Sequence, residues 1–166
     1  MSGIVFQELR EARALAYSAG AAYNFGNRKG DQNLMLGAVF CQADKTNEAV
    51  EAFVELFDDL PKSAERFEEA RQSILNRYRT AKIGFRGVIG AVRAWERLGL
   101  SVDPRQWRFE QIQQLDMTAM LKFYGDRIQN RAKLISIVGD GSKIDKERLT
   151  QVGPVVEVGL EEIFVE

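Results

Sequence analysis

The chain has 166 residues, of which 45% are hydrophobic and 28% charged, and its 23 basic and 24 acidic residues give a net charge of −1. This length suits one domain with a core of its own, and the evenly mixed charge argues against a nucleic-acid-binding surface. No apolar run approaches the roughly 20 residues that a membrane-spanning helix needs. Met1 leads into a polar helix and not into a basic segment followed by an apolar one, which predicts that there is no signal peptide.

Metal-binding residue types are scarce in this chain. Histidine is absent and Cys41 is the only cysteine, so an internal disulfide is excluded. Zinc sites are built from His, Cys and carboxylates, and zinc seldom accepts oxygen ligands alone. We therefore expect no metal site on this chain.

The first two dozen residues change from the hydrophobic period of a helix to that of a strand. Ile4, Val5 and Leu9 recur at helical spacing up to Ala14. From Leu15 the period is two, which predicts a strand with unequal faces. The larger residues of one face are Leu15, Tyr17, Ala19, Ala21 and Tyr23, and the small residues of the other are Ala16, Ser18, Gly20 and Ala22. The small-residue face would allow close approach by another group.

A second strand is predicted over residues 33–42, where both faces are apolar, as in a strand that is covered on both sides. The polar, Gly-containing turn at residues 25–31 (FGNRKGD) indicates an antiparallel hairpin. A phosphate-binding loop at this turn is disfavoured, because no Gly-Lys-Ser/Thr follows it.

The middle of the chain is predicted to be helical. Thr46 and Ser63 are candidate caps of the first two helices, and Asp103 followed by Pro104 is typical of a helix start. The last of these middle helices begins at Asp116 or Thr118. The predicted helices cover residues 46–60, 64–81, 87–98, 103–115 and 116–128.

Three glycines, Gly84, Gly87 and Gly90, recur at a spacing of three. On a helix they would form a smooth ridge for close packing, or they could mark a helix start. Alternatively, they could form a hinge that lets the segment shift.

The C-terminal part is predicted to return to the sheet. Residues 133–138 (KLISIV) are a short apolar run before Gly139, which predicts a buried strand. Ser142 and Lys143 after the glycines could form an anion nest, but Asp140 opposes this and favours a turn. A short helix at 145–151 and a strand at 155–158 follow. The order of elements predicts an α+β fold, with an antiparallel or mixed sheet and helices packed on one face.

The stretch from Phe6 to Ser18 resembles the second, metal-free half of the pitrilysin/insulinase family of zinc metallopeptidases. The matching residues are Phe6, Glu8, Leu9, Arg10, Glu11, Arg13, Leu15, Ala16, Tyr17 and Ser18. The resemblance continues more weakly through 134–140, 152–158 and the acidic-aromatic end, and it covers essentially the whole chain. The H-x-x-E-H zinc motif of the family's other half is absent here.

The resemblance implies roles for Arg10 and Tyr17, which would bind the substrate backbone near the cleaved bond. The zinc ion and the general-base Glu would belong to a partner half with H-x-x-E-H, on the same chain or another, and this chain alone would be inert. Arg13 is the competing arginine, but the seven-residue spacing to Tyr17 selects Arg10. From the pattern alone, Arg10 could be a solvated charge and Tyr17 a core aromatic with a satisfied hydroxyl.

Family half-domains usually begin with a further strand and a longer first helix. We therefore expect residues 1–166 to be a single half-domain that lacks those pieces and leaves an apolar face uncovered, which a second copy could hide. The family fold also serves as catalytically silent scaffold subunits, which is the alternative function. An independent enzyme of another class has no nucleophile constellation or cofactor loop to support it.

Overall fold

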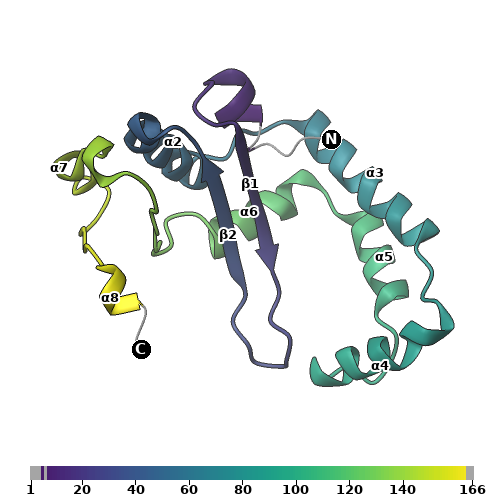
Figure 1. Cartoon of the computed structure of the whole chain (residues 1–166). Helices are drawn as coiled ribbons and strands as arrows, with labels where there is room; N and C mark the ends of the chain where they lie inside the picture. The colour runs from purple at the N-terminus through teal and green to yellow at the C-terminus, as the bar shows by residue number, and fades with distance from the viewer. Residues whose placement is uncertain (1–4, 6, 164–166) are drawn as a thin grey trace. The chain divides into compact units, whose positions relative to one another are not determined.

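The computed structural model describes residue 5 and residues 7–163. The fold is α+β, as predicted, with helices and a two-stranded antiparallel sheet (Figure 1). The chain forms two compact units. The first comprises Met1–Gly20, Ala38–Leu56 and Lys133–Glu166, and the second comprises Ala21–Gly37 and Phe57–Ala132. Among the described helices, none is both long and apolar enough to cross a membrane.

The predicted helix-to-strand change near the N-terminus is present. A short helix with π-type geometry, η1 (Gln7–Ala12), is followed by strand β1 (Ser18–Asn24). The strand begins later than predicted, because residues 13–17 form the turn between the two elements. Ile4 and Phe6, which belong to the predicted helix and to the peptidase-like stretch, lie outside the described residues.

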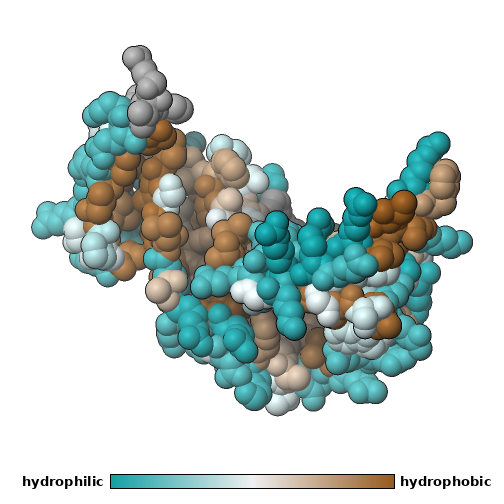
Figure 2. Space-filling view, turned by 90° about the horizontal axis from the view of Figure 1, so that it is seen from below, coloured by the Kyte–Doolittle hydropathy of each residue, from teal (hydrophilic) through white to brown (hydrophobic). Residues whose placement is uncertain are grey.

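Strands β1 and β2 (Leu34–Phe40) form the predicted hairpin. The half-buried residues are Ala19 and Tyr23 in β1, and Met35 and Val39 in β2. The prediction that β2 is covered on both faces is wrong. Its other face is exposed and carries Leu34, Leu36 and Phe40, each more than half accessible. No further strand extends the described sheet. On the face of the molecule that Figure 2 presents, apolar residues are open at the surface.

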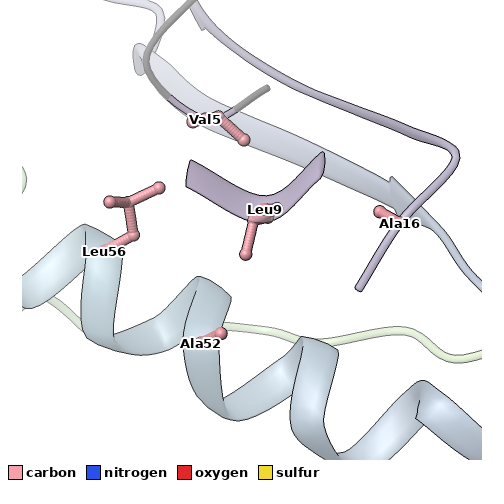
Figure 3. Packing of buried hydrophobic residues seen from close by; sticks show 5 residues of the cluster. All are labelled: Val5, Leu9, Ala16, Ala52 and Leu56. Carbon is pink, nitrogen blue, oxygen red and sulfur yellow. The ribbon is translucent and has the colours of Figure 1, made fainter. Parts of the chain in front are cut away.

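The core of the first unit joins η1 to helix α2 (Thr46–Asp58). Leu9 is fully buried, and in Figure 3 its side chain points toward α2, where Ala52 and Leu56 face it. Val5 and Ala16 complete the buried cluster, against which Leu15, Ala19, Val39 and Phe53 pack. The hairpin therefore packs one face on α2, as the α+β prediction requires.

Thr46 is not an N-cap, contrary to the prediction. A 3-10 turn, η2 (Ala43–Lys45), precedes it, and the Thr46 hydroxyl donates back to the Ala43 carbonyl at 2.9 Å. The chain therefore enters α2 through an already helical turn. Asn47, the next residue, is buried and serves a different purpose, described below.

The helices of the second unit agree closely with the prediction. They are α3 (Ala64–Thr80), η3 (Phe85–Gly87), α4 (Val88–Arg97), α5 (Arg105–Gln114) and α6 (Met117–Arg127). The Ser63 hydroxyl caps α3 by accepting from the Arg66 N–H at 3.2 Å. Asp116, and not Thr118, caps α6, because its carboxylate accepts from the Ala119 N–H at 2.7 Å.

The predicted helix start at Asp103 is displaced by one position. Pro104 is the N-cap of α5, and the helix begins at Arg105. Asp103 still accepts from the Arg105 N–H at 2.9 Å, so its carboxylate does serve the helix start.

The glycine ridge is only partly present. Gly84 precedes η3 and Gly87 precedes α4, which agrees with the helix-start alternative. A Cβ atom added at Gly84 or Gly90 would meet none of the described residues within 4 Å. Close packing therefore does not explain these glycines, and the hinge stays a prediction.

The predictions of C-terminal strands at 133–138 and 155–158 are wrong. Both segments are coil in the structure, as Figure 1 shows. Strand geometry persists only where a neighbouring backbone supplies hydrogen bonds, and the described sheet pairs with neither segment. The acidic-aromatic end at 164–166 lies outside the described residues.

Two short helices lie between these coil segments and a third follows them. They are η4 (Gly141–Lys143), α7 (Lys146–Leu149) and α8 (Leu160–Ile163). The Asp140 carboxylate accepts from the Ser142 N–H at 3.0 Å and from its hydroxyl at 2.7 Å, so it occupies the donors that an anion nest would use. The turn alternative at Asp140 is therefore favoured over the anion nest.

Two side chains of α2 hold the start of α7 in the first unit. The buried Asn47 amide donates to the Asp145 carbonyl at 2.6 Å and accepts from its N–H at 3.0 Å. One turn further along α2, Glu51 forms a forked ion pair with Arg148, at 2.5 and 2.6 Å. The hydrogen bond from Arg148 lowers the pKa of Glu51.

Candidate functional site

Tyr17 lies in the turn just before β1 and is 67% exposed. Its backbone N–H donates to the Phe40 carbonyl at 3.0 Å, and its ring lies 6.2 Å from the Phe40 ring, centroid to centroid. None of the described residues forms a hydrogen bond with its hydroxyl. The phenol is thus fixed at its backbone and open at its polar end.

Tyr124 shows what a structural tyrosine looks like in this protein. It is buried, its hydroxyl donates to the Phe57 carbonyl at 3.0 Å, and it accepts from the Leu60 N–H at 3.2 Å. Burial raises the pKa of this phenol. Tyr17 is exposed, and its hydroxyl has no partner among the residues that the structure describes. The interpretation of Tyr17 as a core aromatic with a satisfied hydroxyl is therefore wrong.

Arg10 is exposed on η1, immediately after the fully buried Leu9. The burial of Leu9 against α2 fixes which way η1 faces, and this leaves Arg10 on the outside of the unit. The Tyr17 ring lies against Phe40, and within residues 5 and 7–163 no hydrogen bond joins Arg10 to Tyr17. Both predicted site residues are accessible, and they flank the same turn.

Arg13, the competing arginine, has a partner within the first unit. Its guanidinium forms an ion pair with Glu55 on α2 at 2.8 Å. This pair ties the turn to α2 and gives Arg13 a structural role.

The turn between η1 and β1 depends on a feature that sequence reasoning missed. Ala14 has a φ of 50°, in the left-handed region that glycine normally occupies. The Leu15 N–H then donates back to the Leu9 carbonyl at 2.9 Å, and Leu15 packs on the core that contains Leu9. This arrangement resembles the closing turns in which a left-handed residue ends a helix. This turn directs the backbone into β1 and so sets the position of Tyr17.

A second surface, in the other unit, lies between α3 and α5. This depression of about 470 Å³ is lined by Tyr78, Arg79, Asp103, Arg105, Gln106 and Phe109. Its charges have partners: Arg105 pairs with Asp103 at 2.5 Å, and Arg79 lies 5.6 Å from the Phe109 ring centre. The ion pair lowers the pKa of Asp103 and raises that of Arg105. We assign no function to this depression, because its charged groups are already engaged.

The residues of this chain do not fit a zinc ion. The sequence has no histidine, and within residues 5 and 7–163 no three Cys, Asp or Glu side chains are grouped so that they could hold a metal.

No protein family, curated protein or solved structure matches this chain. The resemblance to the peptidase family therefore rests on the residues from Phe6 to Ser18 and on the weaker C-terminal similarity, and it stays a prediction.

Proposed function

We propose that this chain is the non-zinc-binding C-terminal half of a zinc-dependent peptidase. It would supply Arg10 and Tyr17 to the active site of a partner half that carries H-x-x-E-H, and it would enclose part of the peptide chamber. The observation that supports this proposal is the open hydroxyl of Tyr17, held at a firm turn within the stretch that resembles the family.

The chemistry asked of these two residues is hydrogen-bond donation. As water attacks a peptide bond, the carbonyl oxygen gains negative charge, and donors already aimed at that oxygen lower the barrier. A guanidinium offers charged, forked donors and a phenol offers one more on a rigid ring. Neither residue has to transfer a proton. A bound peptide backbone would be the element that brings Arg10 and Tyr17 into one network.

The chain alone would be inactive, because two exposed hydrogen-bond donors cannot activate water. The proposal therefore requires a second protein surface. The exposed apolar side chains Leu34, Leu36 and Phe40 on the hairpin are consistent with this requirement, since they lie on an open sheet face of the kind that partners cover.

The test uses this chain alone, a separate protein half that carries H-x-x-E-H, and the two mixed with zinc and a pool of quenched fluorescent peptides. We expect cleavage only in the mixture. Tyr17→Phe should lower turnover by about tenfold to a thousandfold, the range for loss of one such donor. Tyr23→Phe is the matched control, since Tyr23 is half-buried and packs on Phe25 and Phe123.

Each other outcome argues against the assigned roles. Cleavage by the purified chain alone would overturn the proposal, as would unchanged turnover for Tyr17→Phe in an active mixture. If the halves associate but cleave nothing, the catalytically silent scaffold becomes the better explanation.

A further inference from the structure

The segment from Leu134 to Val138 (LISIV) lies open to solvent and has no backbone partner. Leu134 is 98% exposed and Val138 97% exposed. No described residue forms a hydrogen bond with any residue of this segment. Ile135, Ile137 and Val138 are β-branched, which favours strands. Exposing these three side chains and Leu134 leaves their apolar surface in water at a cost in free energy.

The β1–β2 hairpin offers the complementary feature. It is a two-stranded sheet, so one edge of each strand presents N–H and C=O groups without a strand beside them in the described chain. Proteins usually protect such edges with charged residues or proline. Neither β1 (SAGAAYN) nor β2 (LMLGAVF) contains a charged residue or a proline. These edges can therefore accept an added strand.

We propose that the chain forms a symmetric, strand-exchanged dimer. In it, residues 134–138 of each copy pair with a hairpin edge of the other copy. Each chain carries one unpaired strand-forming segment and one unguarded hairpin, so reciprocal exchange satisfies both and closes the assembly. The segment and both strands are uncharged, which favours apolar self-association over a charged partner. This inference does not depend on the peptidase proposal.

The test is sedimentation equilibrium of the full chain from micromolar to submillimolar concentration, together with hydrogen exchange of the same samples. We expect a species of twice the 18.8 kDa chain mass. Amides of 134–138 and of the hairpin should become protected together as the dimer forms. A monomer throughout, or a dimer in which 134–138 exchanges freely, would overturn the proposal.

Proline variants identify the pairing. Ile135→Pro and Ser136→Pro each remove one N–H, and neighbouring N–H groups in a strand point to opposite sides, so one of the two must face the partner edge. That variant should raise the dimer Kd at least about tenfold, because a symmetric dimer loses the bond twice.

Lys82→Pro is the matched control. Lys82 is exposed, and Ala81 before it has φ −71° and ψ 125°, which suits a residue that precedes proline. The control should dimerise like the unmodified chain, and far-UV circular dichroism shows whether each variant keeps its helices. If both Ile135→Pro and Ser136→Pro dimerise normally, strand pairing by this segment is refuted.

Discussion

Asn47 is the side chain whose removal has the most directly calculable consequence. Its amide makes two hydrogen bonds to the backbone of Asp145, 98 residues away in sequence, and it is buried. Asn47→Ala leaves both backbone groups of Asp145 without this partner. Two such bonds are worth about 1–3 kcal/mol, and the better helix propensity of Ala offsets up to about 0.7 kcal/mol. We therefore expect a net loss of roughly 1–2 kcal/mol.

A second substitution at this position separates the amide's donor from its acceptor. Asn47→Asp keeps an oxygen for the Asp145 N–H but sets a carboxylate oxygen against the Asp145 carbonyl in place of the donor. It should destabilise more than Asn47→Ala at neutral pH. On acidification the carboxyl gains a proton that it can donate, so the deficit relative to the unmodified chain should shrink as the pH falls from neutral toward the ordinary Asp pKa of about 3.9.

The assay is thermal and urea unfolding of the full chain, with hydrogen exchange of residues 145–153 as the local readout. At about 2–4 °C per kcal/mol for a chain of this size, Asn47→Ala should lower Tm by roughly 2–8 °C. If α7 opens by itself, Tm stays constant and the amides of Arg148 and Leu149 lose protection instead. Asn76→Ala is the control, because Asn76 is exposed on α3. Unchanged Tm together with unchanged protection would refute the role of Asn47.

Three further predictions concern single sites. Ala14→Gly should stabilise the chain by about 1 kcal/mol in urea unfolding, because Ala14 has a φ of 50° and glycine adopts this conformation without strain; a loss of stability would refute the assigned turn. Tyr124→Phe should destabilise by about 1–3 kcal/mol, since the Phe57 carbonyl and the Leu60 N–H lose their partner, whereas an equal effect of Tyr17→Phe would contradict the contrast between the two tyrosines. Arg148 lowers the pKa of Glu51, so this ion pair contributes stability above the ordinary Glu pKa of about 4.3, and the contribution is lost as the pH falls through the lowered pKa. The Tm difference between the unmodified chain and Glu51→Gln should therefore shrink below about pH 4. A difference that grows on acidification would contradict the pairing.

Helices were the elements that the sequence predicted best, because their signals are local. The Ser63 cap and the end of α4, which Gly99 follows with a φ of 76°, could be identified from neighbouring residues alone. Each helix satisfies its backbone within its own segment, so a correct pattern is sufficient. Thr46 failed as a cap only because a 3-10 turn already precedes it.

The sequence selected candidate site residues but did not predict the geometry around them. The change of period after Ala14 marked the turn correctly, and the motif selected Arg10 and Tyr17. The left-handed conformation of Ala14 has no sequence signal, since glycine is the residue expected there. Nor could the pattern predict that Tyr17 is exposed, because it shares its alternation with the half-buried Ala19 and Tyr23.

The incorrect strand predictions have one physical cause. A strand is specified by its own side chains but exists only beside another backbone. Residues 134–138 have the side chains of a buried strand and the accessibility of a loop, and β2 has two apolar faces but cover on only one. Both departures are of one kind, an apolar β surface without its neighbour, and a single added layer could correct both. Whether that layer is a second copy or a peptidase half then becomes a measurable question, because the dimer protects the amides of 134–138 without any partner protein, whereas the heterologous assembly protects them only after mixing.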